Sequence, residues 1–273
     1  MTTLVDGRPG DAVPAADRGL QYGDGLFETV AVVDGRPCLW DRHLRRLRDG
    51  CERLALPSPD PDVISAEAET LAAGHARAVL KLILTRGDGG RGYRPPRDPR
   101  PRRVLALHPW PEYPEAWRTG GVGVRWCATR LGFQPRLAGL KHLNRLEQVL
   151  ARVEWDDPAV GEGLMLDLDG NVVSGTQSNL FVLHRGTLLT PPVDRCGVAG
   201  VARAVALETA RACGITVREA RLSREDVTAA AALFLTSSLI GLWPVRELDG
   251  APRDPRAVPA ALAARIVASV FEP

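Results

Sequence analysis

Residues 26–56 read LFETVAVVDGRPCLWDRHLRRLRDGCERLAL, and this stretch predicts a strand, a tight turn and an amphipathic helix. Its first part, 26–33, is a nearly continuous apolar run rich in valine, which is typical of a buried strand. The Asp–Gly pair at 34–35 favours a hairpin turn. Over 40–56, apolar residues then recur at helical steps of three and four before Pro57: Leu44, Leu47, Cys51 and Leu54. This succession of strand and helix indicates a mixed α/β fold.

The rest of the chain continues to alternate between helical and strand-like patterns. Helices are predicted at 62–76, 142–155, 200–214 and 256–270, and strands at 78–86, 103–108, 121–128, 163–168, 178–184, 187–190, 215–220 and within 231–245. Several prolines after the strand that ends at residue 108 favour a linker. We therefore expect a small N-terminal α/β domain (1–108), a linker (109–118) and a larger C-terminal domain (119–273) that carries Lys141.

The composition is that of an ordinary globular protein and argues against several functional classes. Of the 273 residues 45% are hydrophobic and 25% are charged, and the net charge of +2 predicts neither nucleic acid nor a membrane surface as a partner. The five cysteines form no C-x-x-C pair and the five histidines no H-x-x-x-H pair, which favours reduced thiols and argues against a metal site. The apolar stretch 227–245 includes Thr, Ser, Gly and Pro, which favours a buried strand and turn over a membrane span. The N-terminus lacks a basic-then-apolar signal, so we expect a cytoplasmic protein.

A segment rich in glycine, proline and arginine at 87–103, GDGGRGYRPPRDPRPRR, interrupts the predicted strands. This composition does not support a packed element, so we expect a mobile surface loop. The arginines of 94–103 are also compatible with an arm that binds nucleic acid, although Tyr93 is the only aromatic residue beside them. A solvated loop is the favoured interpretation because the chain as a whole is nearly neutral.

Lys141 is one of only two lysines among 35 basic residues, and the other is Lys81. An amine forms a Schiff base with an aldehyde, which a guanidinium does not do usefully, and the pKa of an amine falls readily on burial. Lys141 lies between a strand end and the start of a predicted helix, which makes it a candidate covalent nucleophile. The alternative is a chance lysine on the surface. Lys81 lies among apolar residues of a predicted strand and has no catalytic interpretation.

Three segments are candidates for binding a phosphate group. The glycines of CGVAGVAR (196–203) precede a predicted helix, whose N-terminus offers free N–H groups and the positive end of the helix dipole. The hydroxyls and amides of TSS (236–238) form a second candidate, with an ordinary serine turn as the alternative. In HLRRL (43–47), Arg46 stands next to the apolar Leu47 and is expected to point inward.

A lysine and several phosphate-binding elements together suit pyridoxal 5′-phosphate, an aldehyde that carries a phosphate group. The chain has no P-loop, no strand–GxGxxG–helix unit and no G-x-S-x-G motif. These absences argue against the commoner nucleotide-binding and hydrolase classes. The sequence therefore predicts an enzyme that uses pyridoxal phosphate on a small-molecule substrate.

Blocks spread over nearly the whole chain resemble the fold-type IV pyridoxal-phosphate enzymes, the group of branched-chain and D-amino-acid aminotransferases. They are DRGLQYGDGLFETV (17–30), HLRRL (43–47), LKLILTRGDGGRGY (80–93), LAGLKHLNRLEQVL (137–150), VVSGTQSNLF (172–181), TPPVDRCGVAGVAR (190–203) and LFLTSSLIGLWPV (233–245). The blocks 80–93 and 137–150 look like the lyase members of the group more than its aminotransferases. The resemblance implies a homodimer with a small α/β domain, a larger domain of barrel-like sheet with helices, and the cofactor between them.

The resemblance also implies roles for individual residues. It implies that Lys141 is the Schiff-base lysine and that the cofactor phosphate is bound by Arg46, Val201, Ala202, Ser237 and Ser238. It also implies polar contacts near the cofactor from Asn179 and, on the substrate side, from Asn144. Arg91 and Tyr93 belong to a loop that the resemblance implies faces the substrate. The lyase members convert 4-amino-4-deoxychorismate into 4-aminobenzoate and pyruvate for folate synthesis, and this is the activity we expect. A D-amino-acid or branched-chain aminotransferase is the alternative. A non-catalytic relative that binds the cofactor, or a nucleic-acid binder, is an alternative of a different class.

Ser174 departs from the pattern of the group, which usually has a glutamate here that pairs with the pyridine nitrogen of the cofactor. Gly175, Asn179 and Phe181 fix the alignment, so the serine is a replacement at this cofactor-binding position. A carboxylate keeps the nitrogen protonated and makes the ring a strong electron sink, whereas a hydroxyl is a weaker and neutral partner. We hypothesise that a lyase tolerates serine because its product is aromatic, and that serine disfavours transamination.

Overall fold

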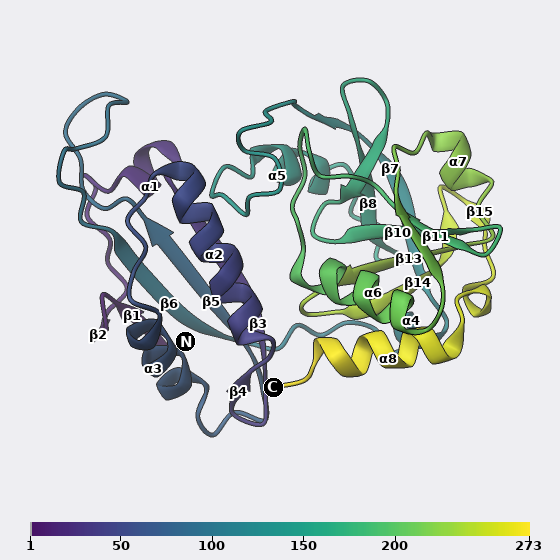
Figure 1. The fold of residues 1–273 in the computed structure, drawn as a ribbon, viewed down its shortest axis with the longest axis horizontal. Helices are drawn as coiled ribbons and strands as arrows, with labels where there is room; N and C mark the ends of the chain where they lie inside the picture. Colours follow the sequence, from purple (N-terminus) through teal and green to yellow (C-terminus); the bar gives the residue numbers. More distant parts are fainter. Residues whose placement is uncertain (1) are drawn as a thin grey trace. The chain divides into compact units, whose positions relative to one another are not determined.

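The computed structural model describes residues 2–273, which pack into two compact units (Figure 1). The first unit comprises the chain up to Pro111 together with Leu140–Asn144 and Phe271–Pro273. The second unit comprises Glu112–Gly139 and Arg145–Val270. No helix within residues 2–273 has the length and apolar character that a membrane crossing requires.

The first unit is a six-stranded antiparallel sheet with helices α2 and α3 packed against it (Figure 1). Its elements are β1 (Thr2–Val5), β2 (Arg8–Pro9), α1 (Arg18–Tyr22), β3 (Gly25–Val33), β4 (Arg36–Pro37), α2 (Trp40–Leu54), α3 (Pro61–Ala72), β5 (Arg77–Thr85) and β6 (Arg102–Pro109). The strand order is β2-β1-β6-β5-β3-β4. The fold of this unit confirms the predicted mixture of strands and helices.

The stretch 26–56 folds as its pattern predicts. Its apolar run lies in β3, and Asp34 and Gly35 form the turn to β4 with φ angles of 48° and 75°. The apolar face of α2 is buried against the sheet, since Leu47 and Cys51 are only 3% and 1% exposed. This burial places the opposite, charged face of α2 outward and fixes which of its residues face β3.

The segment around Lys141 joins the first unit, whereas the sequence analysis assigned it to the larger C-terminal domain. The backbone N–H of Phe27 donates to the carbonyl of Lys141 at 2.9 Å, and the N–H of Leu143 donates to the carbonyl of Gly25 at 3.0 Å. Leu26 and His142 form an isolated antiparallel bridge. These bonds satisfy the backbone of 141–143 along the edge of β3, so the segment is extended and not helical.

The helix predicted at 142–155 is therefore shorter than expected, and α5 spans Leu146–Arg152. Apolar residues recur in this segment at helical spacing. Of these, Leu146 is 76% exposed, Leu150 57% and Val153 74%. The apolar side of this segment therefore lies on the surface of the chain.

The second unit is built on a nine-stranded curled sheet. Its elements are α4 (Ala116–Thr119), β7 (Val122–Leu131), α5, β8 (Val160–Asp167), β9 (Val172–Gly175), β10 (Asn179–His184), β11 (Thr187–Thr190), α6 (Val201–Ala212), β12 (Thr216–Glu219), α7 (Arg224–Thr228), β13 (Ala232–Ser237), β14 (Gly241–Leu248), β15 (Ala251–Pro252), η1 (Pro255–Ala257) and α8 (Ala260–Val270). The strand order is β12-β11-β10-β13-β14-β7-β8-β9, and β15 pairs with β14. Helices α6 and α8 pack against each other and against β13 and β14 (Figure 1).

The apolar block 231–245, predicted to be a buried strand and a turn, folds as a buried hairpin of two strands. Strands β13 and β14 are antiparallel, and Phe234 opposes Pro244. Trp243 is 2% exposed and belongs to the main core of the second unit, together with Leu235 and Val245. The hairpin brings the Thr-Ser-Ser segment to the end of β13, next to β10.

The N-terminal region contains elements that the sequence analysis did not predict. Strand β1 pairs with β6, and α1 follows with Asp17 as its N-cap. The Asp17 carboxylate accepts the N–H of Gly19 at 2.8 Å, and Gly23 ends the helix in the left-handed conformation with φ 64°. An aspartate and a glycine that bracket five residues are a helix signal that was present in the sequence.

Candidate active site

The side chain of Lys141 lies beside an aromatic ring of β3. Its Nζ is 4.3 Å from the centroid of the Phe27 ring. The only other lysine of the chain, Lys81 on β5, has its Nζ 5.7 Å from the same centroid. Both amines therefore lie near one ring. Lys81 is part of strand β5, and the backbone carbonyl of Lys141 is bonded to β3. An ammonium over a ring is favoured electrostatically, which helps to orient each side chain.

Next to Phe27, Glu28 forms a buried cluster with two residues of α2. The Glu28 carboxylate is 1% exposed, and it receives the Nε–H of Arg46 at 2.9 Å and a second bond from Arg46 Nη2. Nδ1 of His43, itself 1% exposed, lies 2.6 Å from the same carboxylate. His43 and Arg46 are three residues apart, so they share one face of α2. The carboxylate thus fixes the guanidinium predicted to bind phosphate.

The pKa values of this cluster are set by burial and by the opposing charges. Burial alone would raise the pKa of Glu28, but the charge of Arg46 and the hydrogen bond from His43 lower it to about 2. Burial lowers the pKa of His43, and Arg46 and Lys141 lower it further, against the opposite effect of Glu28. At neutral pH, Glu28 is therefore ionised and His43 neutral, with its Nδ1–H donating to Glu28.

The other candidate residues of the first unit lie on exposed segments. Arg91 is exposed, and Tyr93 is 85% exposed with its ring centroid 5.5 Å from that of Tyr22. The side-chain amide of Asn144 donates from Nδ2 to the carbonyl of Gly23 at 3.0 Å. The structure thus ties Asn144 to the turn before β3, on the same segment as Lys141.

In the second unit, the N-terminus of α6 is an anion-binding geometry. Gly200 is the N-cap of α6, and no side chain among residues 2–273 forms a capping hydrogen bond with the N–H groups of the first turn. Val201 and Ala202 open the helix and are 5% and 2% exposed. Asn179 supports the turn by donating from Nδ2 to the carbonyl of Val198 at 3.0 Å. A Cβ on Gly200 would lie 2.1 Å from Oδ1 of Asn179, so any larger residue here would displace the Asn179 side chain from its present position.

The end of β13 adds hydroxyl groups to the same unit. Thr236 opposes Asn179 in the pairing of β13 with β10, and it is 1% exposed. Its Oγ1 has no hydrogen-bond partner among the described residues 2–273. Ser237 and Ser238 follow and are half-buried. A buried hydroxyl without a protein partner is costly, which is the condition expected where a polar ligand completes the bonding.

Ser174 lies at the end of β9 and makes only a local bond in the described chain. Its Oγ donates to the carbonyl of Gly175 at 2.9 Å. The turn that follows is organised by Glu162 of β8, which the sequence analysis did not single out. Glu162 is 1% exposed, and its carboxylate accepts three hydrogen bonds from this turn. The donors are the backbone N–H of Thr176 at 3.0 Å, the hydroxyl of Thr176 at 2.5 Å and the hydroxyl of Ser178 at 2.7 Å. A glutamate inside the otherwise apolar run GEGLML was the available signal.

The candidate residues are therefore shared between the two units. Lys141, Arg46, Asn144, Arg91 and Tyr93 belong to the first unit, and Ser174, Asn179, Val201, Ala202, Ser237 and Ser238 belong to the second. Within the first, Glu28 of β3 bonds to His43 and Arg46 of α2, and the N–H of the neighbouring Phe27 bonds to the carbonyl of Lys141. Within the second, β10, β13 and the start of α6 converge on Asn179.

These residues fit the parts of pyridoxal phosphate. A phosphate group suits the uncapped N-terminus of α6, the glycine cradle at Gly200 and the buried hydroxyl of Thr236. An aldehyde suits the amine of Lys141, and Arg46 adds a guanidinium that a carboxylate already orients. The first unit thus offers an amine and a guanidinium, and the second offers uncapped N–H groups and a hydroxyl; each set by itself suits one part of the cofactor.

Replacing Gly200 by alanine is expected to weaken binding of pyridoxal phosphate by about tenfold or more, because the new Cβ displaces Asn179 and the first turn of α6. An absorbance titration of the apo-protein with the cofactor measures the dissociation constant. Gly10→Ala is the control, since a Cβ there would meet no described atom within 4 Å. Equal affinity in the Gly200 and Gly10 variants would contradict the assignment of this turn.

The chain belongs to the class IV amino-transferase family, whose model matches residues 25–248. This membership and the fold confirm the resemblance that the sequence predicted. A protein named aminodeoxychorismate lyase from Vibrio harveyi is 36% identical to it, with 90% of each chain covered.

Solved structures extend the comparison to the fold. A 4-amino-4-deoxychorismate lyase from Pseudomonas aeruginosa is 50% identical and superposes with a TM-score of 0.89 over 92% of this chain and 93% of that one. A hypothetical aminotransferase from Mycobacterium tuberculosis, solved in a form bound to pyridoxal phosphate, is 26% identical with a TM-score of 0.83 and 99% of both chains covered. The chain is thus more similar to a lyase than to that aminotransferase.

Proposed function

We propose that this protein is a pyridoxal-phosphate-dependent carbon–oxygen lyase that converts 4-amino-4-deoxychorismate into 4-aminobenzoate and pyruvate. The observation that carries the proposal is the 50% identity to the Pseudomonas aeruginosa lyase over 92% of this chain. The amine of Lys141 beside Phe27 and the oriented guanidinium of Arg46 support it. Turnover of the aminated chorismate with detection of pyruvate tests it, and no pyruvate from cofactor-loaded protein would overturn it.

Several residues would hold the cofactor. We assign its covalent attachment to Lys141 and its phosphate group to Arg46, to the N–H groups of Val201 and Ala202, and to the hydroxyls of Ser237 and Ser238. Asn179 maintains the turn before α6 through its bond to Val198. Ser174 would face the ring nitrogen as a neutral partner. When bound, pyridoxal phosphate supplies an aldehyde for amines and a ring that withdraws electrons.

In the proposed reaction Lys141 moves the protons. Its freed amine takes the proton from the substrate carbon that bears nitrogen, as a general base. Loss of the enolpyruvyl ether then leaves an aromatic ring, and protonation of the departing enolpyruvate gives pyruvate. We propose that Arg91, Tyr93 and Asn144 contact the substrate, whose two carboxylates suit a guanidinium and a phenol.

Aromatisation explains why a serine suffices at residue 174. Formation of the benzene ring drives the electron flow, so the reaction depends less on a strongly electron-withdrawing cofactor. Transamination has no such driving force and benefits from a carboxylate at the ring nitrogen. Ser174 therefore biases the site toward the lyase reaction.

The change Ser174→Glu is expected to raise side transamination of amino acids, by roughly tenfold, since it restores a charged partner for the ring nitrogen. Assaying 2-oxo acid formation from an amino acid and 2-oxoglutarate measures this activity. Ser174→Gln serves as the control for size without charge. If the glutamate variant transaminates no faster than wild type, the explanation of Ser174 fails.

An aminotransferase is the second candidate, because the Mycobacterium tuberculosis relative shares the fold over its whole length. Feeding the purified protein either the aminated chorismate or an amino acid with 2-oxoglutarate distinguishes the two activities. We expect pyruvate from the first mixture and little amino transfer in the second.

We further propose a cytoplasmic homodimer that serves folate synthesis. The exposed apolar face of α5, formed by Leu146, Val149 and Leu150 and continued by the C-cap residue Val153, supports association with a second copy. Light scattering of the purified protein determines its mass, and a monomer of 29.5 kDa would contradict the dimer.

A further inference from the structure

The segment between β5 and β6 is attached to α1 at its first residues. The backbone N–H of Arg18 donates to the carbonyl of Gly87 at 2.9 Å. The N–H of Gly89 donates to the carbonyl of Ala16 at 3.1 Å. Beyond Gly89, Arg91 and Tyr93 are exposed, and the backbone of Gly92 and Tyr93 bonds to side chains of α1.

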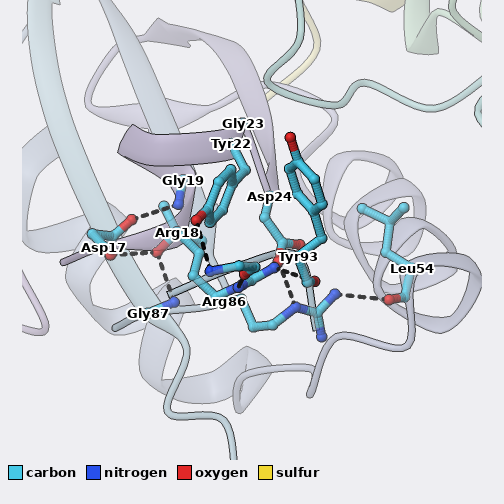
Figure 2. Close-up of polar contacts among 12 residues, drawn as sticks. Asp17, Arg18, Gly19, Tyr22, Gly23, Asp24, Leu54, Arg86, Gly87 and Tyr93 are labelled. Atoms are coloured by element: carbon cyan, nitrogen blue, oxygen red, sulfur yellow. Dashed lines mark hydrogen bonds and ion pairs between the residues drawn. The ribbon is translucent and has the colours of Figure 1, made fainter. Parts of the chain in front are cut away.

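Arg18 holds the exposed part of this loop with its side chain (Figure 2). Its Nη1 donates to the carbonyl of Gly92 at 3.0 Å, and its Nη2 to the carbonyl of Tyr93 at 2.9 Å. Arg18 is 3% exposed, although it lies in a segment of the surface. Tyr22 assists, since its hydroxyl accepts the N–H of Gly92 at 3.3 Å. Two charge-assisted bonds to loop carbonyls order the loop more strongly than neutral bonds would.

The guanidinium of Arg18 is itself fixed by Asp24. Oδ2 of Asp24 accepts Nε–H from Arg18 and from Arg86, each at 2.8 Å (Figure 2). Burial would raise the pKa of Asp24, but the hydrogen bonds and charges of the two arginines lower it. Arg86 in turn donates to the carbonyls of Ala55 and Leu54, at 2.7 and 2.9 Å. Asp24, itself bonded to Arg86, thus holds the guanidinium of Arg18 in one orientation.

The turn that contains Asp24 is also bonded to the segment of Lys141. Asp24 is flanked by Gly23, whose carbonyl accepts from Asn144, and by Gly25, whose carbonyl accepts from Leu143. The turn before β3 therefore bonds to Arg18 through Asp24, and to the segment of Lys141 through the carbonyls of Gly23 and Gly25. Ordering of the loop by Arg18 sets its position relative to Lys141.

We propose that Arg18 is a positioning residue for substrate binding, which fixes the 87–93 loop so that Arg91 and Tyr93 meet the anionic substrate. The proposal rests on the proposed function for what the loop binds. The ordering of the loop rests on the contacts of Arg18 alone. Arg18 touches neither cofactor nor substrate in this role, so its loss affects binding of substrate and not binding of cofactor.

The test is Arg18→Met, which keeps an unbranched apolar side chain that reaches about as far as Nε of arginine and removes the guanidinium. Trypsin can cut the loop after Arg91 and after Arg97, whereas Arg94 and Arg100 precede proline. We expect cleavage at these two sites, followed by mass spectrometry, to become about tenfold faster, because cleavage follows the open population of the loop. We expect KM for the aminated chorismate to rise about tenfold, with kcat and the cofactor dissociation constant within about threefold of wild type.

Two glycine variants separate loop order from a general loss of folding. A Cβ on Gly89 would lie 2.6 Å from Cδ of Arg18, so Gly89→Ala displaces the side chain without removing it and should reproduce the effect. A Cβ on Gly90 would meet no described atom within 4 Å, so Gly90→Ala should behave as wild type. Circular dichroism melting confirms that each variant is folded.

The outcomes distinguish this proposal from the proposed function. Unchanged cleavage of the Arg18→Met and Gly89→Ala variants would overturn it, whatever the enzyme catalyses. Faster cleavage with unchanged KM would also overturn it, since the loop would then not bind substrate. If wild type transaminates and does not release pyruvate, the proposed function fails, and KM for the amino acid decides the role of Arg18.

Discussion

Lys141→Ala is expected to lower the turnover of the aminated chorismate by roughly 10⁴-fold or more, since in the proposed reaction one amine serves as attachment point and as general base. Lys141→Arg is expected to fail equally, because the site needs an amine and not a positive charge. Pyruvate release by cofactor-saturated protein measures both effects. The variants should also lose the visible absorbance that a covalently held cofactor gives.

The chain offers a matched control in its other lysine. Lys81 lies 5.7 Å from the centroid of the Phe27 ring, which Lys141 approaches to 4.3 Å. Lys81→Ala is expected to retain turnover within a few-fold of wild type. Comparable losses at both positions would indicate that the charge around Phe27 matters and not the amine of Lys141.

Glu28→Gln is expected to destabilise the apo-protein by about 3 kcal/mol, because it leaves the buried charge of Arg46 without its carboxylate. Urea titrations at neutral pH measure the free energy of unfolding. Glu115→Gln removes the carboxylate of an exposed pair with Arg118, at 3.6 Å, and should change stability by less than about 0.5 kcal/mol. Equal effects of the two substitutions would contradict a structural role for the buried cluster.

The same cluster predicts how stability depends on pH. The pKa of Glu28 falls from 4.5 to about 2 on folding, so its contribution is full above pH about 5 and is lost as the pH falls toward 2. The difference in stability between wild type and Glu28→Gln should shrink over this window. A difference that stays constant down to pH 2 would show that the carboxylate is not held ionised.

Local patterns predicted most of the regular elements. The apolar run of β3, the Asp–Gly turn and the face of α2 are properties of neighbouring residues, so sequence periodicity reveals them. The same is true of β13 and β14, since their residues are apolar on both faces. The helix α1 was missed although its caps at Asp17 and Gly23 were visible, because it is too short to show a period.

The helix predicted at 142–155 marks the limit of such patterns. Periodicity alone favours a helix from His142 onward, but bonds to Gly25 and Phe27 hold the first residues in an extended conformation. Those partners are more than a hundred residues away in the sequence. Tertiary pairing therefore overrides local propensity at the segment that carries Lys141.

Sequence by itself indicated the chemistry that we propose: a scarce amine at Lys141, a glycine turn before a helix and, by resemblance to the family, serine in place of glutamate at residue 174. These are properties of residue type, and a covalent amine or a missing carboxylate needs no coordinates to be recognised. Only the tertiary structure decided how the groups are held. Glu28 and Glu162 are buried against partners from other segments, and Asp24 bonds to Arg18 and Arg86 from two different elements. Such burial and distances exist only once the chain has folded.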